Sequence, residues 1–204
     1  MRASLRSYFP VVALLIAVPA VWAGTVTFNF NSDPSGKATQ FTDTSGGISG
    51  TFSSSGDPGG FQVGPSFFKT LTGQVLLDPG PAGLNNLTLT VLFSTTGSSI
   101  TLDFATNSSA GVPFDLSAYD GSTLVGTATV TGTIPSGFTF PEGAISFSGA
   151  TFNEVVLSAP AATDFAVDNI AFTTGTSVPE PSTALLMFFG ASALLTLARR
   201  RATK

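Results

Sequence analysis

The chain has 204 residues, with eight Lys and Arg against twelve Asp and Glu, and it contains no Cys and no His. Without these two residue types the chain cannot form a Ser-His-Asp triad, a thiol nucleophile or a zinc or iron site built on His and Cys ligands. Any bound metal would have to be a hard cation held by oxygen atoms, and calcium is the natural candidate.

The first 23 residues have the layout of a signal peptide. Two arginines lie in residues 1–6, residues 11–18 are continuously apolar, and Pro19 interrupts the apolar run before a Val-Trp-Ala sequence. Small or modest residues at these positions suit signal peptidase, so we predict cleavage between Ala23 and Gly24. A permanent membrane helix is disfavoured here, because the apolar run is too short to span a bilayer. The chain is therefore predicted to be exported.

Residues 24–175 have the composition and periodicity of an all-β domain. Thr, Ser, Gly, Val and Phe dominate, and short stretches of alternating polar and apolar residues are separated by Gly, Pro and Asp. Strands with one buried face are expected, in chain order, at residues 25–30, 87–93, 99–104, 127–130, 144–147 and 165–172. Asp120-Gly121 predicts a hairpin turn, because both residues tolerate positive φ. About ten short strands predict an antiparallel sandwich of two sheets.

The charge of the β domain is hidden by the whole-chain totals. Six of the eight basic residues lie in the two terminal segments, which leaves Lys37 and Lys69 against eleven acidic residues in residues 24–178, a net charge of −9. A surface of this sign repels phosphate backbones, so we expect no nucleic-acid partner. Neutral glycans and cations remain as partner classes.

Sixteen of the nineteen phenylalanines lie in the β domain. We interpret most of them as core filling, because each buried ring removes a large apolar area from water. A sugar-stacking platform would favour Trp and Tyr, whose polar edges can stay wet, and Tyr119 is the one such residue left after signal-peptide cleavage. Phe61, Phe67 and Phe68 are predicted exceptions on an exposed loop, since the period-two pattern is lost around them.

Residues 176–204 combine three features in order. The first is an extended Pro-Glu-Pro element after Val178, formed by Pro179, Glu180 and Pro181. The second is an uncharged apolar stretch that is predicted to form a transmembrane helix; it includes Ala184, Leu185, Leu186 and Leu197. The third is the basic run Arg199, Arg200 and Arg201, which stops the helix and stays on the cytoplasmic side.

This combination resembles the C-terminal sorting signal of PEP-CTERM proteins, which are exported by Gram-negative bacteria that make exopolysaccharide. The resemblance implies that an exosortase, a membrane-embedded transpeptidase-like enzyme, recognises the Pro-Glu-Pro element and removes the tail. The protein would lie in the inner membrane during sorting and then at the cell surface or in the extracellular matrix. The alternative is a plain membrane anchor, which needs no Pro-Glu-Pro element.

A second resemblance lies within the β domain. Residues 118–127, 152–157 and 163–172 are similar to the C-terminal half of jelly-roll domains often found ahead of such tails, which are themselves similar to carbohydrate-binding and galactose-binding-like modules. The resemblance implies a jelly-roll-like sandwich in which the last strand pairs with the first. It also implies that an acidic residue of the last strand ligates a structural calcium ion.

Asp168 matches that acidic position, and the resemblance would place its partner ligands among Asn31, Asp33 and Asp43. The pattern around Asp168-Asn169 has a second interpretation, because the alternation is irregular there. A bulge or strand end, in which polar groups cap the backbone, would produce the same irregularity. Both interpretations make Asp168 a structural residue.

The sequence thus predicts an exported, non-catalytic protein with a structural or adhesive role in an exopolysaccharide matrix, processed by signal peptidase and exosortase. One alternative is a calcium-dependent carbohydrate-binding module. A more remote alternative is a glycoside hydrolase that uses two carboxylates. Most acidic residues lie in turn sequences, and among them Asp103 and Asp168 are embedded in predicted strands.

Overall fold

The computed structural model describes residues 24–175, apart from 56–59, 80–86, 109–111 and 161–162. The predicted signal peptide and the predicted sorting segment lie outside the described residues. Within the described part the chain forms strands and no helix, so no helix there could cross a membrane. The strands are β1 Thr25–Phe28, β2 Phe41–Ser45, β3 Ile48–Ser55, β4 Gln62–Pro65, β5 Gln74–Leu77, β6 Thr88–Thr106, β7 Pro113–Asp120, β8 Thr123–Thr131, β9 Glu142–Ser158 and β10 Phe165–Thr174.

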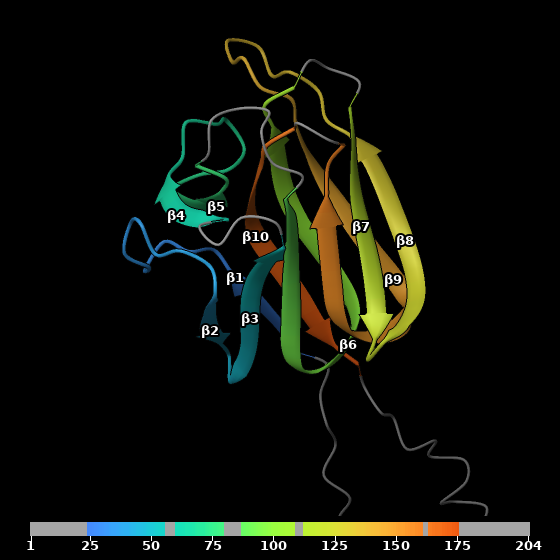
Figure 1. Ribbon diagram of the computed structural model, residues 1–204. Coiled ribbons are helices and arrows are strands. Elements are labelled where there is room, and N and C mark those ends of the chain that lie inside the picture. The colour runs from blue at the N-terminus through green and yellow to red at the C-terminus, as the bar shows by residue number, and fades with distance from the viewer. Residues whose placement is uncertain (1–23, 56–59, 80–86, 109–111, 161–162, 176–204) are drawn as a thin grey trace, which may run out of the picture. The chain divides into compact units, whose positions relative to one another are not determined.

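The strands pack as two antiparallel layers (Figure 1). One layer runs β2, β3, the first part of β6, the last part of β9, β7 and β8. The other layer runs β4, β5, β10, the last part of β6 and the first part of β9, with β1 pairing the C-terminal part of β10. The predicted pairing of the first and last strands is confirmed, with Val26 opposite Phe172.

Two long strands, β6 and β9, belong to both layers and join all ten strands into one continuous hydrogen-bonded sheet. The prediction of two separate sheets is therefore corrected, and the predicted strands at 87–93 and 99–104 are two parts of β6. The pairing of β6 with β9 shifts register on either side of Gly97, where β6 passes between the layers. A Cβ atom at Gly97 would lie 2.3 Å from the Phe172 ring and 2.8 Å from the Thr173 carbonyl oxygen, so this crossing requires glycine.

The space between the layers is filled largely by phenylalanine. Ten Phe side chains are buried: Phe28, Phe30, Phe52, Phe61, Phe93, Phe104, Phe114, Phe152, Phe165 and Phe172. Stacked pairs link the two layers, with ring centroids 3.9 Å apart in Phe93–Phe172 and 4.3 Å apart in Phe104–Phe114. Burying each ring stabilises the fold by about 1.5–3 kcal/mol, so the core interpretation of these residues is confirmed.

The hairpin predicted at Asp120-Gly121 is also confirmed. Asp120 pairs with Thr123 across a tight hairpin between β7 and β8, and Gly121 in the turn has a φ of +59°. Gly tolerates this left-handed conformation because it has no Cβ atom.

We predict that Gly97→Ala lowers the free energy of unfolding by about 2–3 kcal/mol, because the added methyl group must displace a core ring and a backbone carbonyl. Chemical denaturation measures this difference. Gly175→Ala is the matched control, since the nearest atoms to its Cβ position lie 4.0 Å away. Equal effects of the two substitutions would contradict the tight crossing.

Candidate functional site

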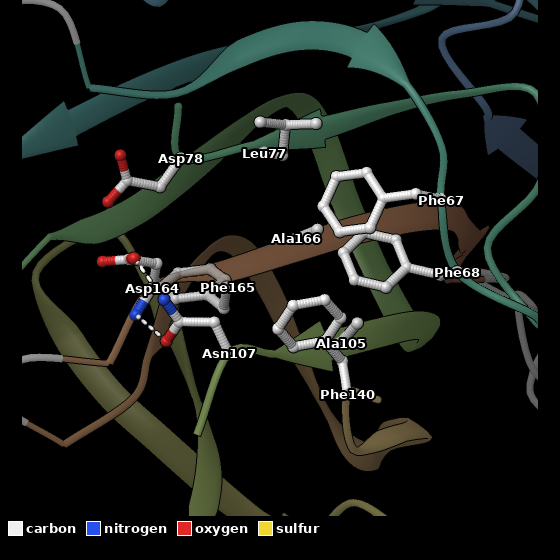
Figure 2. Close-up of a pocket in the computed structure, with 10 residues that line it drawn as sticks. All are labelled: Phe67, Phe68, Leu77, Asp78, Ala105, Asn107, Phe140, Asp164, Phe165 and Ala166. Atoms are coloured by element: carbon white, nitrogen blue, oxygen red, sulfur yellow. Dashed lines mark hydrogen bonds between the residues drawn. The ribbon is translucent and has the colours of Figure 1, made fainter. Parts of the chain in front are cut away.

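A pocket of about 350 Å³ opens on the outer face of the layer that contains β10 and β6 (Figure 2). Alternation along the two strands explains its position. Phe104 and Phe165 point into the core, so their neighbours Ala105 and Ala166 point outward. The residues between β4 and β5, 66–73, fold over these two alanines and bury them. We call residues 66–73 the aromatic loop; the small alanine side chains leave space beneath it.

One wall of the pocket is aromatic. Phe67 and Phe68 of the aromatic loop lie with ring centroids 4.3 Å apart, and Phe140, just before β9, lies 5.7 Å and 5.9 Å from them. Phe67 is 58% exposed although the rings pack together. The cluster therefore presents an apolar ring surface to solvent at the mouth of the pocket.

The opposite end of the pocket is polar (Figure 2). Asn107 donates from its Nδ2 atom to Oδ2 of Asp164 at 2.5 Å, and the Asp164 backbone N–H donates to Oδ1 of Asn107 at 3.1 Å. The Asn107 backbone N–H also donates to the Asp164 carbonyl oxygen at 3.0 Å. The second carboxylate oxygen of Asp164 is buried and has no hydrogen-bond partner among the described residues. Asp78 borders the same end.

A buried carboxylate at the start of β9 fixes the aromatic loop. Glu142, which is 4% exposed, accepts hydrogen bonds from the backbone N–H of Lys69 at 2.8 Å and of Thr70 at 2.7 Å. The Thr70 hydroxyl donates a third at 2.6 Å. These bonds satisfy a charged group that would otherwise be costly to bury. They fix the position of the two residues that directly follow Phe67 and Phe68 in the loop.

A second carboxylate, on β10, fixes the end of the aromatic loop. Asp168 is fully buried and accepts from the backbone N–H of Thr72 at 3.2 Å and of Asn169 at 2.8 Å. Burial raises the pKa of Asp168 from 3.8 to about 6, and the nearby Asp103 carboxylate adds to this rise, while the two backbone hydrogen bonds oppose it. The carboxylate therefore supports the loop at the cost of desolvating its charged form.

The bulge predicted at Asp168-Asn169 is confirmed. The register of β10 against β6 shifts between Asp168 and Ala171, and Asn169 has a φ of +50°. The Asn169 side chain donates from Nδ2 to Oδ2 of Asp103 at 2.9 Å. The two strand-embedded acids named from the sequence are therefore cross-strand neighbours, and Asn169 lies against one of them.

The residues predicted to share a calcium ion with Asp168 have other partners. Asn31 accepts from the Gln74 backbone N–H at 2.8 Å, Asp33 forms an ion pair with Lys37 at 2.5 Å, and Asp43 accepts from the Thr44 backbone N–H at 2.8 Å. Within the described ranges no three acidic side chains come together as a metal site. The structure therefore gives the calcium prediction no support.

The sequence identified the aromatic loop in part. Phe67 is exposed and Phe68 is half-buried, whereas the prediction for Phe61 was wrong, because it is fully buried against Phe165. Sequence reasoning missed the roles of Glu142, Asn107, Asp164 and Phe140. One signal of the pocket was present in the sequence. Ala105 and Ala166 are small residues at outward positions of strands that otherwise carry larger side chains.

We predict that Glu142→Ala lowers the free energy of unfolding by about 2–4 kcal/mol, because it leaves two backbone N–H groups of the loop without acceptors. Amide hydrogen exchange should accelerate most at Lys69 and Thr70. Glu154→Ala, on the same strand, is the control. Unchanged exchange in the loop would rule out the proposed support by Glu142.

We predict that Asp168 makes stability pH-dependent. Its pKa in the folded chain lies above the unfolded value, so the folded chain binds the proton more readily. This contribution to stability is fully present below about pH 4 and is lost as pH rises through about 6. Relative to Asp168→Asn, the wild-type free energy of unfolding should therefore fall by about 2–3 kcal/mol between about pH 4 and 7.

Denaturant titrations of both proteins at the two pH values measure this change. Asp120→Asn, in the exposed hairpin turn, is the control for replacing a carboxylate by an amide at an exposed position. A pH-independent difference between wild type and Asp168→Asn would contradict the prediction.

Residues 177–202 match the PEP-CTERM protein-sorting motif. No curated protein sequence matches the chain. Among solved structures, the K2 cleaved adhesin domain of Lys-gingipain is similar with a TM-score of 0.51 and 14% identity, covering 74% of this chain and 98% of that domain. The K1 cleaved adhesin domain of Lys-gingipain from Porphyromonas gingivalis W83 has a TM-score of 0.47 and 11% identity, covering 74% and 99%.

A family 29 carbohydrate-binding module is also similar, with a TM-score of 0.39 and 14% identity, covering 76% of this chain and 91% of that module. At these identities the likeness to the K2 adhesin domain concerns the fold alone. The chain therefore combines an all-β sandwich domain, of a fold shared with that adhesin domain, and a PEP-CTERM protein-sorting motif at residues 177–202.

Proposed function

We propose that the protein is exported across the inner membrane of a Gram-negative bacterium, is processed by an exosortase, and serves as a non-catalytic structural or adhesive component of the cell surface or exopolysaccharide matrix. The observation that carries this proposal is the match of residues 177–202 to the PEP-CTERM protein-sorting motif. A signal peptide at residues 1–23, removed by signal peptidase after Ala23, accounts for export. Val178 and the Pro-Glu-Pro element at 179–181 are the segment that the exosortase recognises.

The tail then has a transient role. The apolar segment that begins at Ala184 spans the inner membrane, and Arg199–Arg201 hold its end on the cytoplasmic side until the exosortase removes it. The β domain is released to the outer side. The chain has no cysteine, so the β domain folds without a disulfide.

A non-catalytic role is supported by the use of the acidic residues in the described part of the chain. Glu142 and Asp168 accept hydrogen bonds from the backbone of the aromatic loop, and Asp164 is paired with Asn107. An acid–base pair for glycoside hydrolysis needs two carboxylates that face the substrate at a fixed separation. Glu142 and Asp168 instead hold the aromatic loop through its backbone, and neither is directed at a ligand.

The sorting proposal predicts that the mature protein lacks Arg199–Arg201 in cells with a functional exosortase and retains them in cells without it. Mass spectrometry of the C-terminal peptide distinguishes the two products. A triple variant, Pro179→Ala, Glu180→Ala and Pro181→Ala, should retain the tail in both strains. Ser182→Ala is the matched control beside the element and should be processed as wild type is. A tail that persists through Arg201 in both strains would identify a plain membrane anchor.

A further inference from the structure

We propose that the pocket beneath the aromatic loop binds one neutral sugar ring of a glycan, with the apolar face of the ring against the phenylalanine cluster and its hydroxyls toward Asn107 and Asp164. This proposal deepens the matrix role proposed above, and it relies on that role for the source of the glycan. The size, polarity and charge of the pocket support the choice of a neutral sugar ring.

The size and the aromatic wall of the pocket suit one sugar ring. Its volume of about 350 Å³ lies at the small end of the range for ligand sites, about 300–1,000 Å³, and suits a single ring rather than a long chain. Phe67, at the mouth, is the most exposed of the large apolar side chains in the described part of the chain, at 58%. A sugar ring that covers it removes apolar area from water, while the rest of the glycan stays in solvent.

The polar end of the pocket suits the hydroxyl-bearing edge of a sugar ring. A carboxylate and an amide at the end of an apolar wall are suited to a ligand that is apolar on one side and carries hydroxyls on its edge. Asp164 is 8% exposed, and its Oδ1 atom lacks a hydrogen-bond donor among the described residues. This oxygen is out of contact with solvent, so a ligand hydroxyl at this end would meet the half-buried Asn107 amide beside it. A fully apolar ligand would remove water from that amide without replacing its hydrogen bonds, which is unfavourable.

The negative charge of the domain and of the pocket disfavours acidic sugars. Asp78 and Asp164 lie at the polar end, and residues 24–178 carry a net charge of −9, so an acidic sugar would be repelled. Among the described residues, no lysine or arginine lines the pocket. We therefore infer an uncharged hexose rather than a uronic acid.

Hydrogen bonds hold the aromatic loop in place before a ligand binds. Glu142 holds the centre of the aromatic loop, Asp168 holds its end, and Leu71 is fully buried beneath it. A hydroxyl within the loop adds a further bond, from Ser66 Oγ to the Leu71 carbonyl oxygen at 2.5 Å. The rings of Phe67 and Phe68 are thus positioned before a ligand arrives, which reduces the entropy lost on binding.

The experiment titrates the full chain, purified in detergent, with neutral oligosaccharides of the gluco, manno and galacto series. Calorimetry measures affinity, and NMR of labelled phenylalanine rings reports the site. Oligomers of a uronic acid are the charged comparison, because the acidic end of the pocket should repel them. We expect at least one neutral series to bind and to shift the ring signals of Phe67, Phe68 and Phe140. We expect Phe67→Ala to weaken that binding about tenfold or more.

Phe138→Ala is the matched control, because Phe138 is a 39% exposed phenylalanine in the segment before β9 that does not line the pocket. It should bind as wild type does. Asp164→Asn should weaken binding of the same neutral oligosaccharide, with the melting temperature measured in parallel to confirm folding. The proposal is overturned if no neutral series shifts the three rings, if a charged oligomer binds more tightly, or if Phe138→Ala loses as much affinity as Phe67→Ala.

The result is separable from the sorting proposal. A chain that loses its tail in an exosortase-dependent manner but binds no neutral glycan overturns the pocket proposal alone. A chain that binds through Phe67 but keeps its tail overturns the sorting proposal alone. Phe67→Ala should be processed as wild type is, because the pocket plays no part in tail removal.

Discussion

The outward face of β10 and β6 sets the constraint on which the pocket depends. In a sandwich, alternate residues of each strand point away from the core, and here those positions carry Ala105, Ala166 and Asp168 instead of a solvated polar row. Such a surface must be covered. Leu71 inserts over it from the aromatic loop, and the mismatch between small alanines and a bulky loop leaves the cavity.

Two buried carboxylates resolve a conflict that this covering loop creates. The loop brings backbone N–H groups out of water, and each such donor needs an acceptor. Glu142 and Asp168 supply acceptors from strands that are about 70 and 100 residues away along the chain. The same contacts explain why the calcium prediction finds no support in the structure. A buried acid on a closing strand can satisfy its oxygens with backbone donors as well as with a cation. The sequence near Asp168 does not show that a loop about 100 residues away supplies such a donor.

Local pattern was sufficient for much of the fold and insufficient for the site. Alternation identified the strands and the phenylalanine core, the Asp120-Gly121 pair identified its hairpin, and the irregularity at Asp168-Asn169 identified its bulge. The passage of β6 and β9 between layers was not readable, because it depends on how Gly97 packs against a ring from another strand. The pocket requires five separate segments to meet. Phe61 is buried against Phe165 and Phe67 is exposed, although both lie where the strand pattern is lost. Tertiary packing decides both.

Strand β10 runs from the pocket to the place where the first and last strands pair. It begins beside the pocket at Phe165 and ends at Thr174, whose backbone N–H donates to the Gly24 carbonyl oxygen. Its ten residues extend about 30 Å, with hydrogen-bonded neighbours on both sides. Because β10 pairs antiparallel with neighbours on both sides, it can be drawn lengthwise out of the sheet only if many of these hydrogen bonds break together.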